Sequence, residues 1–262
     1  IAVGAQTENL VPLDKVIYAL RDVTGTTESI PLIVSSIMSK KIACGATYIV
    51  IDIKCGEGAL IKTKKDAETL SKWLIEIGRH FNRKIKTIIT EMDEPLSSCI
   101  GNALEVKEAI EVLKGKENKL EQVSVEVASQ LISMYKDIPL KEATNLAKQT
   151  LKDNTAYEAF EKWITNQNGD LSKIKVSENI LELKSNRDGI IKHISALACG
   201  KLSLKLGAGR LTKESQIDYS VGIKLLVQKG DKVSKNQTLA KLYVKDKNIK
   251  FTKEDLQIFQ IN

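Results

Sequence analysis

The sequence is poor in the residues that build metal and redox sites. It contains two histidines and four cysteines in 262 residues. The cysteines stand far apart and form no C-x-x-C pair, whereas structural zinc sites use closely spaced cysteine and histidine ligands. We therefore expect no structural zinc site, and we interpret the thiols as reduced core or loop residues of a cytoplasmic protein. They are Cys44, Cys55, Cys99 and Cys199.

Long apolar runs and aromatic residues are also scarce. No apolar run reaches the ~18 residues of a membrane-spanning helix, and no signal-peptide pattern is present. We therefore expect neither a membrane span nor secretion. Aromatic residues make up 5% of the chain, and its net charge is +7. Because no basic run is flanked by stacking aromatics, we interpret the charge as a lysine-rich surface that steers a small anion such as phosphate, and we expect no nucleic-acid binding.

The remaining composition is that of a globular protein. Hydrophobic residues make up 42% and charged residues 28%, and the length predicts two lobes. The chain begins IAVGAQTENLVP, without an initiator methionine, which is typical of a strand end entered in mid-domain. We therefore expect the C-terminal part of a longer protein. Gln6 lies in this strand-end segment, where α/β proteins contact ligands, although a plain turn explains it equally well.

Residues 12–43 form the most informative stretch. They contain two helical runs separated by the turn sequence Thr-Gly-Thr-Thr. Ser36 and Lys40 are four residues apart and share a helix face, while Tyr18 and Arg21 stand at the end of the first run. A hydroxyl, an ammonium and a planar guanidinium suit a flat heterocycle with carbonyl and N–H edges. Charged helix residues are usually only solvated, but the apolar neighbours indicate that the second helix packs. These neighbours are Ile33, Val34, Ile37 and Met38.

Two aspartates accompany these residues. Asp14 lies near the start of the first run, and Asp22 follows Arg21. We interpret both as helix caps or as ion-pair partners that orient Lys15, Arg21 or the helix ends. These are structural functions.

The next segment has the pattern of a strand–helix–strand unit. Residues 46–54 form an apolar, β-branched run that predicts a buried parallel strand. A Gly-Glu-Gly turn, an amphipathic helix over 64–81 and a strand over 84–90 follow. His80 is interpreted as a charge at the helix end. The third glycine and the downstream acid of a dinucleotide fingerprint are absent, so dinucleotide binding is not expected.

Helices and then short strands complete the chain. Residues 101–115 predict a helix capped by Asn102 and stopped by Gly115. Three further helical runs over 119–167 indicate packing and no chemistry. From residue 176 onward the pattern changes to short strands separated by turns, one of them at Gly230–Asp231.

Several motifs, in order over almost the whole chain, closely resemble the pyrimidine-nucleoside phosphorylases and the related thymidine phosphorylases. They are YALRD (18–22), SSIMSKK (35–41), VIDIKCGEGA (50–59), GNALEVKEAIEVLKG (101–115), and LGAGR with the following ID and VGI (206–223). The resemblance implies an α/β fold. It divides into a parallel-sheet lobe, a helical pair from an inserted all-helical lobe, and a C-terminal α+β sandwich-hybrid.

The resemblance also implies the domain limits. The central α/β domain would comprise residues 1–12 and 44–118, and residues 13–43 would be part of the helical lobe. Residues 119–175 would form a helical segment of the α/β lobe, and residues 176–262 the C-terminal domain. The C-terminal pattern V-x-x-G-D-x-V-x-x-x-Q-x-L resembles the hammerhead half-barrel of biotinyl and lipoyl domains. No carrier lysine motif is evident there, so a carrier function is not expected.

For function, the resemblance implies a transferase of nucleoside salvage. Phosphate would convert uridine, thymidine or deoxyuridine to the free base and a sugar 1-phosphate, in a cytoplasmic homodimer formed through the helical lobe. Arg21 and Lys40 would stabilise the leaving base, Ser36 and Tyr18 would bind it, and Gln6 would line the substrate site. The family's phosphate-binding loop lies upstream of this sequence, so we expect the polypeptide alone to turn over little substrate.

A monovalent cation, potassium in particular, is a further implication of the resemblance. Its ligands would be the backbone carbonyls of Leu96 and Cys99 and the carboxylate of Glu108, an all-oxygen set that suits a hard cation. An equally plausible alternative pairs Glu108 with Lys107 or Lys114 in solvent. No organic cofactor is implied.

Two other functions remain open at this point. The first two lobes resemble anthranilate phosphoribosyltransferase as well, although the C-terminal lobe argues against that reading. A non-catalytic remnant or binding module is the second alternative. It is motivated by the missing upstream loop and by Leu60, which stands where the family usually has an aromatic residue.

Overall fold

The computed structural model describes residues 3, 10–210, 212 and 215–262, apart from the side chains of Asp22 and Val23. Helices and sheets are both present, which confirms the mixed α/β class. The chain divides into two compact units, residues 1–91 with 123–149 and residues 92–122 with 150–262. Among the described residues, no helix is both long and apolar enough to cross a membrane.

The first unit contains the predicted strand–helix–strand segment. β1 (Tyr48–Cys55) pairs in parallel with β2 (Lys84–Glu91) along its full length, and α3 (Lys64–His80) connects them. Parallel strands need such a crossover. Thr63 caps α3 by accepting a hydrogen bond from the backbone N–H of Asp66 at 3.1 Å. The helix therefore begins where the sequence predicts.

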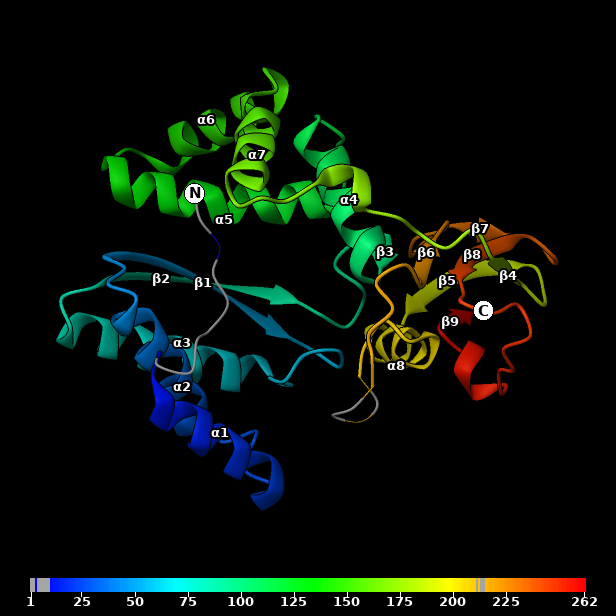
Figure 1. The fold of residues 1–262 in the computed structure, drawn as a ribbon, viewed down its shortest axis with the longest axis horizontal. Helices are drawn as coiled ribbons and strands as arrows, with labels where there is room; N and C mark the ends of the chain where they lie inside the picture. Colours follow the sequence, from blue (N-terminus) through cyan, green and yellow to red (C-terminus); the bar gives the residue numbers. More distant parts are fainter. Residues whose placement is uncertain (1–2, 4–9, 211, 213–214) are drawn as a thin grey trace. The chain divides into compact units, whose positions relative to one another are not determined.

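Helices cover both faces of this strand pair (Figure 1). α3 packs on one face, and α5 (Lys119–Lys136) runs along the other. On the α5 side, Tyr48 and Tyr135 meet edge to face with ring centroids 5.6 Å apart, and Lys86 donates a hydrogen bond to Gln130 at 3.2 Å. α6 (Leu140–Lys152) follows α5.

The predicted helical pair consists of α1 (Pro12–Thr24) and α2 (Ile30–Ala43). Each helix has a proline in its first two positions, where no N–H partner is lost. Gly25 ends α1 in the left-handed conformation, with φ 67°. The buried face of α2 packs with α3 and β1 in one apolar cluster, as its sequence indicates. The cluster contains Ile33, Val34, Met38, Ile53, Ile61, Ala67, Leu70 and Leu74.

The second unit contains two antiparallel sheets. One has the strand order β3-β6-β8-β4 and the other β7-β5-β9. The strands are β3 (Cys99–Ile100), β4 (Ile180–Lys184), β5 (Gly189–Ile194), β6 (Gly222–Leu225), β7 (Lys232–Val233), β8 (Thr238–Tyr243) and β9 (Phe259–Ile261). The short strands predicted after residue 176 are thus confirmed. The predicted turn at Gly230–Asp231 also forms, with the Gln228 N–H bonded to the Asp231 carboxylate at 2.8 Å.

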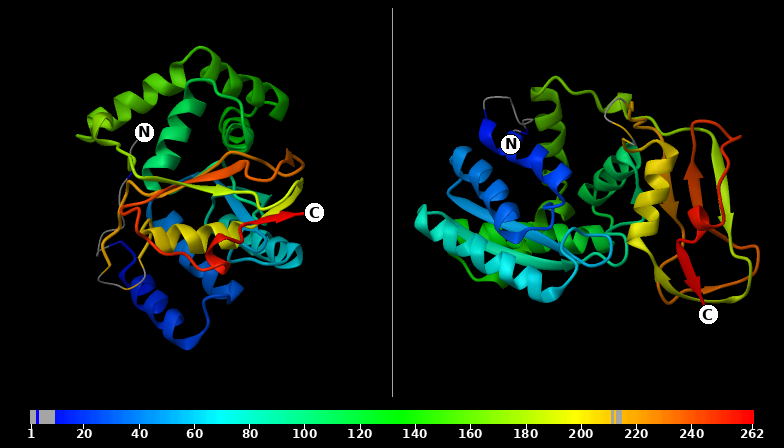
Figure 2. Two further views of the ribbon diagram at one scale, coloured as in Figure 1. Left: turned by 90° about the vertical axis from the view of Figure 1, so that its right-hand side faces the viewer. Right: turned by 90° about the horizontal axis from the view of Figure 1, so that it is seen from below.

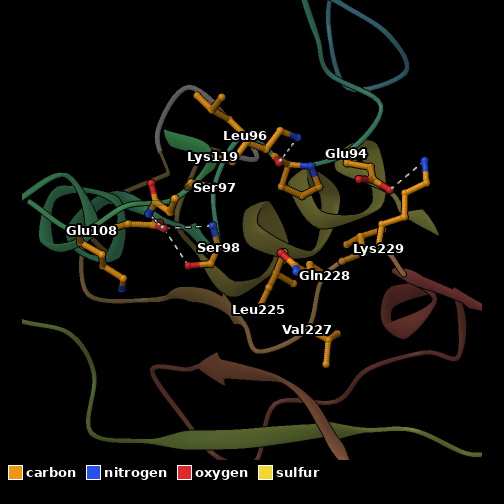
Figure 3. A pocket seen from close by; sticks show the side chains of 14 residues that line it. Glu94, Leu96, Ser97, Ser98, Glu108, Lys119, Leu225, Val227, Gln228 and Lys229 are labelled. Carbon is orange, nitrogen blue, oxygen red and sulfur yellow. Dashed lines mark hydrogen bonds and ion pairs between the residues drawn. The ribbon is translucent and has the colours of Figure 1, made fainter. Parts of the chain in front are cut away.

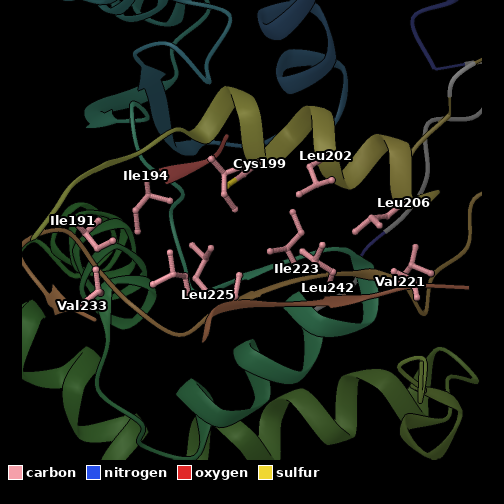
Figure 4. Close-up of a cluster of buried hydrophobic side chains, with 14 residues drawn as sticks. Ile191, Ile194, Cys199, Leu202, Leu206, Val221, Ile223, Leu225, Val233 and Leu242 are labelled. Carbon is pink, nitrogen blue, oxygen red and sulfur yellow. The ribbon is translucent and has the colours of Figure 1, made fainter. Parts of the chain in front are cut away.

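One helix in this unit was not located from the sequence. α8 (Ala196–Leu206) begins at a Ser195 cap and lies beside the strands (Figure 2). Its side chains Cys199, Leu202 and Leu206 point into the core formed with the strands (Figure 4). The stretch LSLKL alternates apolar and polar residues, which is a strand-like period, and this obscured the helix.

α4 (Asn102–Leu113) and α7 (Thr155–Asn166) complete the helices of this unit, with short 3-10 turns at Leu171–Lys173 and Glu254–Leu256. The predicted cap at Asn102 is wrong. Gly101 occupies the cap position, and the Asn102 amide instead donates to the carbonyl of Ala208 at 3.0 Å. Gly115 follows the helix end with φ 92°, which confirms it as the stop signal.

Residues 99–100 form the edge strand β3 of the four-stranded sheet. Cys99 lies opposite Lys224, and Ile100 lies opposite Ile223. The contact is close because two glycines meet there. A Cβ on Gly222 would lie 2.2 Å from the carbonyl oxygen of Ile100. This side-chain-free contact joins the segment before α4 to the C-terminal strands.

Candidate functional site

Arg21 lies buried at the junction of α1 and α2, with 4% of its surface exposed. Its guanidinium donates hydrogen bonds to the carbonyls of Thr26 at 3.4 Å, of Leu32 at 3.5 Å, and of Thr27. The half-exposed ring of Tyr18 lies 5.2 Å from the guanidinium carbon, within cation–π range. Arg21 therefore holds the turn between the two helices, and Tyr18 covers one side of it.

Lys40 and Ser36 meet on α2 as the four-residue spacing predicts. The Lys40 ammonium donates to the Ser36 hydroxyl at 2.7 Å, and it also bonds the carboxylate of Asp14 at 2.5 Å. Ser36 and Asp14 are buried, whereas Lys40 remains partly exposed. Asp14 was expected to pair within its own helix run or to cap it. Its ion pair instead reaches across the helical pair, 26 residues along the chain.

The pKa of Asp14 reports on this cluster. Burial raises it, but hydrogen bonds from Lys40 and Ser36 and the positive charges of Lys40 and Arg21 outweigh burial and leave the pKa below its usual value. Asp14 is therefore a carboxylate at neutral pH. Arg21, Lys40 and Asp14 thus combine two cations and one anion. The anion, Asp14, interacts with side chains that the sequence analysis predicts to bind a ligand.

Two sequence predictions concern neighbouring positions. Gln6 lies outside the described residues, and so does the side chain of Asp22. Leu60, the position with the unexpected aliphatic residue, is half exposed. Its side chain thus leaves much of its apolar surface uncovered in the described structure.

A second polar cluster lies at the carboxyl ends of β1 and β2. Two of its residues belong to the motif at 50–59, but sequence reasoning singled out none of its side chains. The Lys54 ammonium bonds Asp52 at 2.6 Å and the Thr90 hydroxyl at 3.0 Å, and Thr90 donates to Asp52 at 2.6 Å. Strand alternation places Asp52 and Lys54 on one face, and that spacing was the available signal. Ligands of open parallel sheets bind at this end of the strands.

In the second unit, a pocket of about 200 Å³ adjoins the segment before α4 (Figure 3). Both Leu96 and Glu108 line it, as does Glu94, whose carboxylate lies 3.8 Å from the ammonium of Lys229. Two of the three predicted cation ligands are thus brought to one pocket. Cys99 is not among its lining residues, and its carbonyl accepts a hydrogen bond from the Ser97 hydroxyl at 3.0 Å.

Glu108 is buried, with 3% of its surface exposed. Its Oε1 accepts from the Ser98 hydroxyl at 2.8 Å, the Ser98 N–H at 3.3 Å and the Asn118 amide at 3.2 Å, and its Oε2 accepts from the Cys99 N–H at 2.9 Å. The alternative of a solvated pair with Lys107 or Lys114 is therefore wrong. Burial, and next the charge of Glu108, raise the pKa of the Cys99 thiol to about 11.

Comparison with known proteins identifies the family. Residues 1–157 match the family model described as "Glycosyl transferase family, a/b domain", and residues 190–257 match the "Pyrimidine nucleoside phosphorylase C-terminal domain". The chain belongs to the glycosyl transferase family of the pyrimidine-nucleoside phosphorylases. The family assignment made from the sequence motifs is thereby confirmed.

Individual relatives agree. The chain is 43% identical to the pyrimidine-nucleoside phosphorylase of Geobacillus stearothermophilus, an alignment that covers 98% of this chain and 61% of the relative. It is also 43% identical to the enzyme of that name from Bacillus subtilis (strain 168), over 95% of this chain and 59% of the relative. The chain thus spans about three fifths of the length of these curated relatives.

Proposed function

We propose that this chain is part of an enzyme that cleaves pyrimidine nucleosides with phosphate. Phosphate attacks the anomeric carbon, the glycosidic bond breaks, and the products are the free base and a sugar 1-phosphate. The observation that carries the proposal is the meeting of Ser36 and Lys40 beside Arg21 in the helical pair. Two relatives named pyrimidine-nucleoside phosphorylase are 43% identical to this chain over 95–98% of its length.

The chemistry follows from where negative charge develops. As the glycosidic bond breaks, the departing base collects negative charge on its ring and carbonyl oxygens. Arg21 and Lys40 stabilise that charge through charge-assisted hydrogen bonds that strengthen toward the transition state. A guanidinium has five N–H donors, and the three bonds to backbone carbonyls within the described chain leave two for the base. Ser36 binds the base edge, and Tyr18 forms a wall.

The arrangement of lobes and subunits belongs to the same proposal. The helical pair is part of an inserted helical lobe, residues 176–262 form a hammerhead-like C-terminal domain, and two copies associate through the helical lobe. An apolar stripe on α1 supports the association. Leu13, Val16 and Leu20 are exposed at helical spacing, and burial against a second copy would remove this apolar surface from water.

A potassium ion near Glu108 is the last part of the proposal. Glu108 Oε2 accepts a hydrogen bond from the Cys99 N–H, and a carboxylate oxygen has a second lone pair that can bind a cation. The residues that would hold the ion are Leu96, Cys99 and Glu108, by oxygen alone. The described residues contain no cluster of three or more His, Cys, Asp or Glu side chains that would compete for a metal.

The test is phosphate-dependent release of uracil and thymine from uridine and thymidine by the complete protein. Lys40→Ala and Arg21→Ala should each lower kcat by about 100- to 1000-fold, the usual loss when one such donor is removed. Lys41→Ala, at an exposed neighbouring position, is the matched control and should retain activity. A folded complete protein without turnover would refute the phosphorylase and favour a non-catalytic binding module.

A further inference from the structure

Asp14 has no assigned function, yet it is among the most buried carboxylates of the chain, with 9% of its surface exposed. It is the third residue of α1. Its partners lie on the other helix of the pair, where the Lys40 ammonium is 2.5 Å away and Ser36 also contributes a hydrogen bond. One carboxylate thus contacts both α2 side chains that the proposed function assigns to the base.

We propose that Asp14 is a positioning residue that, with Ser36 as the second partner, orients the Lys40 ammonium toward the departing base. The inference rests on the proposed function, since it concerns the same site. It assigns Asp14 no contact with substrate. Its effect on the reaction passes through the Lys40 ammonium.

The geometry of an ammonium group supports this function. Lysine carries its charge on a flexible four-carbon chain, with three N–H donors in tetrahedral arrangement. Asp14 and Ser36 accept hydrogen bonds from two of these donors, with Nζ–oxygen distances of 2.5 and 2.7 Å. Two fixed partners determine the direction of the third donor, and the partly exposed position of Lys40 leaves it accessible to a ligand. A pre-oriented donor stabilises developing charge without reorganisation during the reaction.

The electrostatic environment supports the same reading. The lowered pKa of Asp14 shows that its carboxylate is ionised at neutral pH. Arg21, Lys40 and Asp14 therefore sum to a single positive charge, which matches one anionic base. The position of Asp14 in the first turn of α1 also favours its ionised form, because the helix dipole stabilises a carboxylate there.

The competing explanation is that Asp14 only holds α1 against α2, in which case Asp14→Asn would lower the stability and leave the kcat of the folded protein unchanged. A double-mutant cycle with Lys40, read together with the stability of each variant, tests the inference. Asp14→Asn is compared with wild type, with Lys40→Ala and with the double variant in the complete protein. Acting through Lys40, Asp14→Asn should lower kcat about 10- to 100-fold, the scale expected for a misplaced catalytic group, with little change in the KM for phosphate. In the Lys40→Ala background it should then have no further effect.

Two further variants control for folding. Asp14→Glu keeps the carboxylate and should recover part of kcat. Glu28→Gln removes an exposed carboxylate from the turn between α1 and α2 and should leave kcat unchanged. Thermal unfolding is measured for every variant. In addition, NMR of the lysine ammonium groups should show a slowly exchanging Lys40 signal in the wild type that is lost in Asp14→Asn.

The outcomes are distinct. Equal kcat in wild type and Asp14→Asn would overturn the inference and leave the proposed phosphorylase activity intact. The same holds if Asp14→Asn lowers kcat by the same factor in the wild-type and Lys40→Ala backgrounds. An inactive wild-type protein would overturn the proposed function, and the inference with it. The ammonium signal reports on the Asp14–Lys40 contact in either case.

Discussion

The two units each bury a carboxylate, and the two carboxylates are satisfied in different ways. Asp14 in the first unit bonds the side chains of Lys40 and Ser36. Glu108 in the second unit bonds two backbone N–H groups, one hydroxyl and one amide, and no ammonium or guanidinium is among these partners in the described chain.

Under the proposed function, the difference separates a ligand clamp, the Asp14 cluster, from a structural support, Glu108. Side chains can turn toward a substrate, so the Asp14 cluster retains donors that respond to a ligand. Backbone N–H groups move only with the chain, so Glu108 fixes the path of residues 98–99 and, through β3, their pairing with β6. We therefore expect loss of Glu108 to reduce stability first and loss of Asp14 to reduce activity first.

The largest effect on stability is expected for Glu108→Ala. The substitution leaves four donors without their acceptor, two of them backbone N–H groups, and should lower the free energy of unfolding by about 3–5 kcal/mol. Denaturant unfolding followed by circular dichroism measures it. Glu105→Ala is the control on the same helix. It removes one bond, to the Gly101 N–H, and should cost about 1 kcal/mol. Equal losses would show that the Glu108 contacts contribute no special stability.

Asp14→Ala should destabilise less, by about 1–3 kcal/mol, because Lys40 is partly exposed and can regain water. The same unfolding measurement compares it with Glu108→Ala in one buffer. A larger loss for Asp14→Ala than for Glu108→Ala would reverse the comparison between clamp and support.

Acid should weaken the Asp14 cluster in a predictable range. The pKa of Asp14 is lowered by folding, so the unfolded chain binds the proton more tightly. Its contribution to stability is therefore complete above the unfolded pKa of about 4 and is lost as pH falls through the lower folded pKa. Unfolding measured between pH 6 and pH 2 should show a smaller acid-induced loss in Asp14→Asn than in wild type. Parallel curves would contradict the expectation.

The chemical reactivity of Cys99 gives a more local test of the Glu108 contacts. With a pKa of about 11, the buried Cys99 thiol is almost fully protonated at pH 8 and should react slowly with iodoacetamide. The exposed Cys44 should react faster. Glu108→Gln removes the neighbouring negative charge and should accelerate Cys99 labelling, measured by mass spectrometry. An unchanged rate would show that burial alone protects this thiol.

The smallest effect is expected at Asp255, a partly exposed carboxylate. Hydrogen bonds from Lys205 and from Thr252 lower the pKa of Asp255 to about 2. NMR titration should find this value, and its contribution to stability should be lost only between about pH 4 and pH 2. Asp255→Asn should change stability less than either buried-carboxylate variant, because water screens a charge that is partly exposed.

Local pattern was sufficient for most elements and for part of the site. Periodicity located α3 and β2, and the four-residue spacing predicted that Ser36 and Lys40 meet. These features depend on hydrogen bonds and side-chain contacts within a few residues, which a sequence shows directly. The motifs then identified the family, and the comparisons confirmed it.

Only the tertiary structure decided which distant residues meet. Asp14 found Lys40 across the helical pair, Ile100 paired with Ile223, and Glu108 met backbone donors rather than solvent. α8 formed in spite of a strand-like alternation because its apolar side chains complete the core of the second unit. The sequence alone determined the short-range order of helices and strands. The long-range contacts depend on how those elements pack, and burial then selects the partner that each polar group can reach.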